Sequence, residues 1–131
     1  MAGELNLRAL CRGMAPLLQP EAFVYCCVSD SPPAGLEPVG TFREAEGLTV
    51  IVSLKQAVAA GLSFEFEWAQ ITLEIHSALE AVGFIATISG ALAKEGIPCN
   101  VVSAWYHDHL FVPYERRHQA MQLLRELAQA A

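Results

Sequence analysis

The stretch Ala69-Gln70-Ile71-Thr72-Leu73-Glu74-Ile75-His76 decides the fold of this chain. Apolar and polar residues alternate along it without a break, and that period of two is typical of a β-strand with one buried face. The residues that follow at 83–96 carry apolar side chains at helical spacing and end in a glycine, which is a common stop signal for a helix. The pattern therefore predicts a strand followed by a helix.

A β-hairpin is expected directly after this helix. Two short apolar runs, 99–105 and 109–113, adjoin a turn at 106–108. Strand, helix and hairpin in this order form a βαββ unit, and right-handed crossover geometry makes its first two strands parallel. This is most of a ferredoxin-like half-domain. A final amphipathic helix is expected over about 115–128, because apolar residues recur there with a helical period.

The N-terminal part carries a similar but weaker pattern. We expect from the sequence a helix at 7–12 capped by Asn6, a strand at 22–28, a proline-rich loop at 29–40, a short strand at 41–45, a strand at 48–53 and a helix at 54–60. These elements suggest a weak internal repeat of type αββα. In this interpretation residues 10–30 match 88–108, and residues 48–60 match 109–121.

The boundary between the two repeats is predicted at Trp68 and Ala69. The alternation of apolar residues slips by one position there, and such a slip moves every following side chain to the other face of a strand. The predicted fold is therefore α+β, with two tandem ferredoxin-like halves at 1–68 and 69–131 packed as one unit. Each half lacks one strand of a complete ferredoxin-like domain, so we expect strands to be shared between halves or between subunits, which also favours a homodimer.

Composition narrows the class of protein. The chain has 131 residues, of which 53% are hydrophobic and 17% charged, as is typical of a folded globular protein. A net charge of −6 argues against nucleic acid as a partner, and no apolar run approaches the ~20 residues of a membrane span. The four cysteines form no Cys-x-x-Cys pair and the first residues lack a signal-peptide core, so we expect buried, reduced thiols and a cytoplasmic protein without cofactor.

Three segments resemble the ACT domain family. They are Val82-Gly83-Phe84-Ile85-Ala86 at the start of a helix, Gly96-Ile97-Pro98-Cys99-Asn100 at its end, and His107-Asp108-His109-Leu110-Phe111-Val112-Pro113. More narrowly, the chain resembles small bacterial proteins of two tandem ACT-like halves with unknown function. The resemblance implies a regulatory module that binds a small molecule, most often an amino acid, at an interface between domains.

The first candidate site is the junction between the strand and the helix, from His76 to Ile85. The resemblance implies ligand contacts there, and free backbone N–H groups at a helix start suit a carboxylate. Its candidate residues are His76, Ser77, Val82, Gly83, Phe84 and Ile85. The alternative is that Ser77-Ala78-Leu79-Glu80 is a capping box, with the helix starting at Ala78 and Ser77 satisfying its N-terminal donors.

The second candidate is His107-Asp108-His109. Neutral imidazoles are good ligands for transition metals, so a metal-dependent enzyme using these three residues is a weaker alternative function. The other interpretation is a hairpin turn in which Asp108 supplies turn chemistry and the histidines line a polar rim around a ligand. Nothing else in the sequence forms a catalytic set, so we expect a protein that is not an enzyme.

A third candidate is the corresponding hairpin of the first half, with Glu44, Glu46 and Gly47. A carboxylate there could receive the α-amino group of an amino acid, and the alternative is a solvated turn with glycine at positive φ. Asn100 could bind a ligand or pair with the backbone. The sequence thus favours an amino-acid binding module that acts through a protein partner or its oligomeric state, and the alternative is a ligand-free protein that uses the same fold for assembly.

Overall fold

The computed structural model describes residues 3–131. Its elements, in chain order, are α1 (Leu7–Arg12), β1 (Pro16–Val28), β2 (Gly40–Glu44), β3 (Gly47–Ser53), α2 (Leu54–Ala59), β4 (Trp68–Leu73), α3 (Phe84–Lys94), β5 (Asn100–Ser103), β6 (Asp108–Pro113), the 3-10 turn η1 (Tyr114–Arg116) and α4 (Arg117–Ala130). They form two compact units. The first unit combines the N-terminal segment up to Pro20 with Ala69–Ala131, and the second is Glu21–Trp68.

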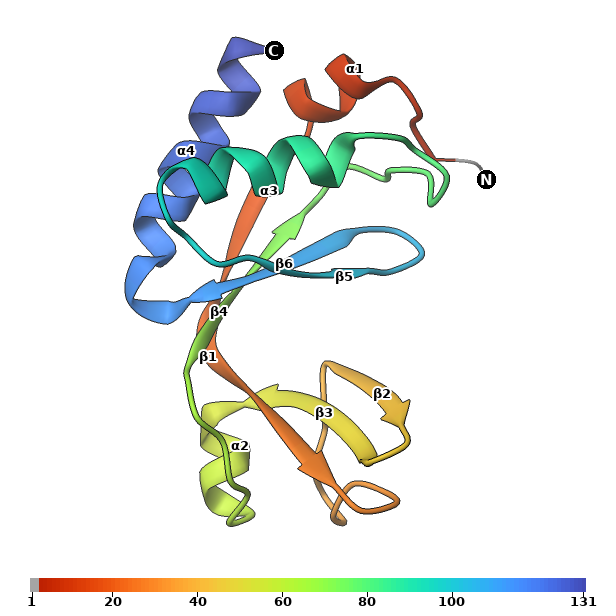
Figure 1. Cartoon of the computed structure of the whole chain (residues 1–131), viewed down its shortest axis with the longest axis vertical. Coiled ribbons are helices and arrows are strands. Elements are labelled where there is room, and N and C mark those ends of the chain that lie inside the picture. Colours follow the sequence, from red (N-terminus) through yellow and green to blue (C-terminus); the bar gives the residue numbers. More distant parts are fainter. Residues whose placement is uncertain (1–2) are drawn as a thin grey trace. The chain divides into compact units, whose positions relative to one another are not determined.

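The first unit is a sheet with helices packed together beside it. Its strands lie in the order β1-β4-β6-β5, and β5 pairs antiparallel with β6 so that Val101 lies opposite Leu110. Helices α1, α3 and α4 contact one another, and Figure 1 shows them gathered next to β4, β5 and β6. Asn6 caps α1 by accepting a hydrogen bond from the Ala9 amide, as the sequence predicts.

The core of this unit joins alternate residues of the strands to the apolar stripes of the helices. Its fully buried residues include Ile71 and Leu73 of β4, Leu110 of β6, Ile88 of α3 and Leu124 of α4. Burying one such side chain contributes about 1.5–3 kcal/mol. The period of two in the strand and the helical period in the flanking segments therefore meet in one core.

The second unit has the strand order β2-β3-β1, and α2 follows β3 directly. The β1–β3 pairing is antiparallel, with Val24 opposite Val52 and Cys26 opposite Val50, and these four residues are part of its own core. Ser53 caps α2 by accepting from the Gln56 amide. Residues 29–39 form no helix, so the long connection from β1 to β2 is a loop, as predicted.

The α+β fold is as predicted, but the matching of the two repeats is partly wrong. Strand β1 begins at Pro16, earlier than expected, and runs through Pro20, which a strand tolerates where no amide donor is needed. Because β1 neighbours β3 as β4 neighbours β6, β1 corresponds to β4, and the β2–β3 hairpin corresponds to β5–β6. The proposed match of 10–30 with 88–108 is therefore incorrect.

The compact units also differ from the sequence halves 1–68 and 69–131. The N-terminal segment packs with residues 69–131, and the start of β1 lies beside β4. The strands β1-β4-β6-β5, in this order, form a four-stranded ferredoxin-like sheet. The second repeat supplies β4, β5 and β6, and the start of β1 from the first repeat supplies the fourth strand. This sharing of a strand within the chain agrees with the small size of the halves, since half-chains of roughly 65 residues bury too little surface alone.

None of the helices in residues 3–131 combines the length and the apolar character that a bilayer crossing needs.

Candidate functional site

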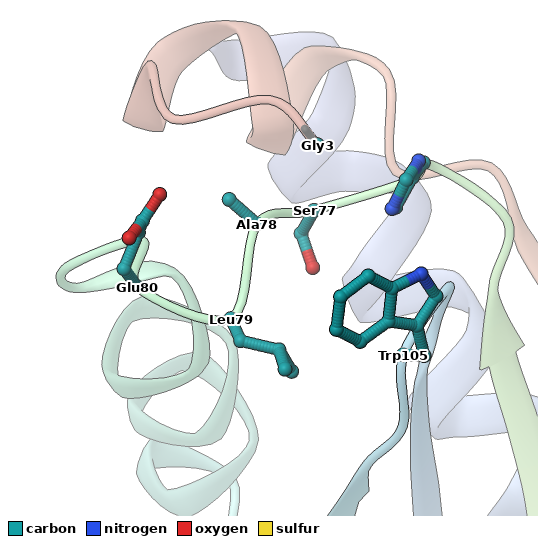
Figure 2. A pocket seen from close by; sticks show the side chains of 7 residues that line it. Gly3, Ser77, Ala78, Leu79, Glu80 and Trp105 are labelled. Carbon is teal, nitrogen blue, oxygen red and sulfur yellow. The ribbon is translucent and has the colours of Figure 1, made fainter. Parts of the chain in front are cut away.

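The connection between β4 and α3 lines two neighbouring cavities of the first unit. The larger has a volume of about 420 Å³, and the smaller about 130 Å³. The larger cavity is lined by Gly3, His76, Ser77, Ala78, Leu79, Glu80 and Trp105, which Figure 2 shows around its opening. The smaller is lined by Ser77, Ala78, Leu79, Ala81, Gly83, Phe84, Ile85, Ala86, Ser103 and Asp108. Three residues, Ser77 to Leu79, belong to both.

The start of α3 forms one wall of the smaller cavity. Gly83 is the N-cap, with φ of 89°, and no side chain caps this helix. The first backbone bond of the helix runs from the Thr87 amide to the Gly83 carbonyl, so the amides of residues 84–86 have no partner within the helix. These donors and the positive end of the helix dipole favour an anion, and a positive φ is readily adopted by glycine.

Ser77 and Asp108 form a buried hydrogen bond beside this helix start. The Ser77 hydroxyl donates to Oδ2 of Asp108 over 3.0 Å, and the two residues are only 7% and 6% exposed. The capping-box interpretation of Ser77 is therefore wrong, because α3 begins at Phe84 and not at Ala78. The turn interpretation of Asp108 is also wrong, since this residue opens β6 and its side chain is buried at the cavity.

The N-terminal segment binds the connection between β4 and α3 through backbone hydrogen bonds. The Glu4 amide donates to the His76 carbonyl over 2.8 Å, and the Ala78 amide donates to the Glu4 carbonyl over 3.0 Å. Gly3 packs so closely that a Cβ there would lie 2.6 Å from the Ala78 amide nitrogen. Only glycine fits at this position, and the loop that lines both cavities is held from two sides.

The histidines of the hairpin do not converge on one point. Because successive residues of a strand face opposite ways, His109 lies on the other side of β6 from Asp108. Its Nδ1 is 3.0 Å from the Thr72 hydroxyl and 3.2 Å from the Gln70 side-chain amide. His107 lies 3.4 Å from the Ile75 carbonyl through its Nδ1. Within residues 3–131 no group of three or more His, Cys, Asp or Glu side chains could hold a metal ion.

The environment of His109 lowers the pKa of its imidazole. Burial is the largest cause, the neighbouring His107 adds to it, and Asp108 acts in the opposite direction. The Gln70 side-chain NH₂ group within hydrogen-bond distance of Nδ1 agrees with a neutral ring, because this group can donate to an unprotonated nitrogen. His109 therefore belongs to a polar cluster of the sheet and does not line either cavity.

Several predicted site residues lie apart from the cavities. Val82 is exposed on the connecting loop, and Asn100 is an exposed residue at the start of β5. Glu44, Glu46 and Gly47 belong to the β2–β3 hairpin of the other compact unit. There the Thr49 hydroxyl donates to Glu44, and Gly47 has φ of 151° with Cys27 packed against it. These features suit the turn interpretation of that hairpin.

Of the residues that line the larger cavity, Ala78, Leu79 and Glu80 lie within the predicted segment from His76 to Ile85 but were not singled out, and Gly3 and Trp105 lie outside it. Gly3 carries no local signal, because only its contact with residues 76–78 requires glycine. Trp105 was included in the strand expected at 99–105, but β5 ends at Ser103 and the indole is 63% exposed. The one local signal is the position of a tryptophan next to a predicted turn, because the exposure of its side chain is decided by the tertiary structure.

Two family models match the sequence, and both are described as ACT domain. The first covers residues 2–69 and the second residues 65–126. No catalytic family is among them. A search of curated proteins gave no significant match.

Several solved structures are similar to this chain. A Vibrio cholerae protein of unknown function, described as a possible transport protein, is 42% identical with a TM-score of 0.83, and the match covers 93% of this chain and 95% of that one. An Agrobacterium tumefaciens protein is 18% identical with a TM-score of 0.72, over 86% and 87% of the two chains. The ligand-free regulatory subunit of aspartate kinase from Thermus thermophilus is 10% identical with a TM-score of 0.62, over 88% and 97%. At such low identities the last two show a shared fold alone.

Proposed function

This chain belongs to the ACT-domain family, and on that premise we propose that it is a regulatory module that binds a free amino acid in the two cavities beside α3. One observation carries the proposal. The smaller cavity places unpaired helix amides and a buried carboxylate around the same space. An amino acid carries one anionic and one cationic group, both bonded to its α-carbon, so it needs such a pair of opposite partners close together.

The amides at the start of α3 would receive the α-carboxylate of the ligand. Asp108 would accept from its α-ammonium group. An ionised carboxylate offers about four acceptor positions, of which Ser77 occupies one, so Asp108 retains capacity for a ligand. Charge-assisted hydrogen bonds of this kind are worth about 1.5–3 kcal/mol each.

The volumes of the cavities suit this division. A space of 130 Å³ corresponds to roughly four water molecules at liquid density, which is enough for the polar head of an amino acid. The larger cavity, at 420 Å³, lies in the size range of small-molecule sites and would take the side chain. Since Ser77, Ala78 and Leu79 line both cavities, one molecule can occupy them together.

Regulation would follow because the ligand contacts three separate segments of the first unit at once. The smaller cavity is built from the β4–α3 connection, the first turn of α3 and the β5–β6 hairpin. A ligand that binds all three stabilises the conformation in which they are close, and it shifts the population toward that state by its differential affinity. We propose that the output passes to a regulated protein partner or to the state of a homodimer, and that the module works in the cytoplasm.

Thermal unfolding of the dialysed protein with each common amino acid tests the proposal. A ligand present at 100 times its dissociation constant should stabilise the native state by about 2.7 kcal/mol. Hits are then measured by calorimetry in two variants. Asp108→Asn keeps an acceptor for Ser77 but removes the charge, and it should lose binding. Glu115→Gln, an exposed carboxylate of the same unit, should retain it. No stabilisation by any amino acid at millimolar concentration would refute the proposal.

A second candidate function is assembly through a sheet edge without a ligand. Strand β2 ends the sheet of its unit, and its Phe42 is 73% exposed. Edge strands with exposed apolar side chains pair readily with other chains. If no amino acid binds, an oligomer that forms with increasing protein concentration, and that dissociates in Phe42→Lys, would support this function.

A further inference from the structure

The larger cavity has an apolar wall that the protein leaves open to water. Trp105 and Leu79 are 63% and 62% exposed, although both are large apolar side chains. Figure 2 shows the two side chains directed toward the same opening, with the Ser77 hydroxyl between them. Single exposed apolar residues are common, but an indole and a leucine that line one hollow mark a binding surface.

The charges around the two cavities restrict what can bind. Among the described residues that line the two cavities there are two carboxylates, Glu80 in the larger and Asp108 in the smaller, and no lysine or arginine, while the larger cavity also holds the imidazole of His76. A second carboxylate on the ligand would therefore meet repulsion from Glu80 or Asp108 with no lysine or arginine beside it to offset that repulsion. Glu80 is exposed, and its carboxylate lies across the cavity from Trp105 in Figure 2, so an ion pair with a basic side chain would be weak.

We propose that the larger cavity is a subsite for a large apolar side chain, aromatic or branched aliphatic, and that Trp105 is the residue that determines this specificity. The inference rests on the proposed function, because the head of the same amino acid occupies the smaller cavity. Trp105 stacks on the ligand side chain from one side while Leu79 packs against it from the other. Both residues lose their exposure to water when the ligand binds.

The two tryptophans of the chain make this testable by intrinsic fluorescence. Trp105 is exposed at the cavity, whereas Trp68 belongs to the other compact unit, where its ring centroid lies 6.0 Å from that of Tyr25. The dialysed protein, residues 1–131, is titrated with phenylalanine, leucine, alanine, glutamate and lysine. With phenylalanine and leucine, the tryptophan emission should shift to shorter wavelength as the Trp105 indole leaves water. The matched variant Trp68→Phe should keep the whole shift.

The dissociation constants of the five amino acids then show whether the larger cavity selects a large apolar side chain. Phenylalanine and leucine should bind at least tenfold more tightly than alanine and glutamate, and Trp105→Ala should weaken phenylalanine binding by about tenfold by calorimetry. Binding of alanine with equal affinity, tightest binding of lysine or glutamate, or unchanged affinity in Trp105→Ala would overturn the inference while leaving the proposed function in place. Absence of binding by every amino acid would overturn both.

Discussion

The buried hydrogen bond between Ser77 and Asp108 should hold the ligand loop in place, and a double-mutant cycle can measure its strength. The two residues are 31 positions apart in the sequence, and the hydroxyl and carboxylate oxygens are 3.0 Å apart. A hydrogen bond to a charged group contributes about 1.5–3 kcal/mol. Ser77→Ala should therefore lower the free energy of unfolding by that amount, because it leaves a buried carboxylate without its donor.

Asp108→Ala should cost a similar amount, since the buried hydroxyl of Ser77 then lacks an acceptor. The double variant should cost less than the sum of the two, with a coupling free energy of about 1.5 kcal/mol or more. Urea unfolding followed by circular dichroism measures all four proteins. Ser89→Ala is the control, because the Ser89 hydroxyl donates to the Ile85 carbonyl one turn earlier in its own helix, and it should change stability by less than about 0.5 kcal/mol.

Two results would refute this reasoning. Additive effects of Ser77→Ala and Asp108→Ala would show that the two side chains do not hold each other. A coupling of Ser77 to Glu80 instead would restore the capping box that the sequence suggests, because Glu80 would then be the partner that shares the helix start with Ser77.

Three further results are expected from the same structure. The pKa of His109 is lowered in the folded state, chiefly by burial, so its contribution to stability is complete above the unfolded pKa of about 6.5 and is lost as the pH falls below it. Urea unfolding across this range should show the loss, and His109→Gln should flatten that part of the profile. Cys27 is the exposed thiol and should react first with a disulfide reagent, while burial raises the pKa of Cys99 to about 11 and slows its reaction; equal rates for all four thiols would contradict this. Gly3→Val should displace the N-terminal segment from the loop and weaken ligand binding, whereas Gly90→Ala, which adds a methyl group in open space on α3, should not. If calorimetry gives Gly3→Val the same affinity for the ligand as the wild type, the docking of the N-terminal segment does not matter for binding.

Much of the fold can be predicted from local pattern. The alternation at 69–76 predicts β4, although the strand ends three residues earlier, at Leu73. The helical spacing after Gly83 predicts α3, and Asn6 predicts the start of α1. Each signal repeats over a few residues and reports which face of an element is buried, so the sequence alone reveals it. The capping-box prediction at Ser77 is wrong because it considers only neighbouring residues. The partner of the Ser77 hydroxyl is Asp108, which lies 31 positions away in the β5–β6 hairpin.

The candidate site was predictable only in part for the same reason. Its core, from Ser77 to Ile85, follows from the junction of a strand and a helix and from the resemblance to ACT domains. Gly3 and Trp105 join it from outside this segment of the sequence, and no periodicity connects them with the loop.

The sequence by itself determined the kind and order of the elements and the α+β class of the fold. An element with one buried face has apolar residues at a spacing of two in a strand or about 3.6 in a helix, and this spacing is visible in the sequence. The tertiary structure alone decided that the N-terminal segment completes the sheet of residues 69–131, and that Asp108 is buried and accepts a hydrogen bond from Ser77. Both depend on which distant segments meet, and that choice is made by the total free energy of packing, which no single stretch of the sequence records.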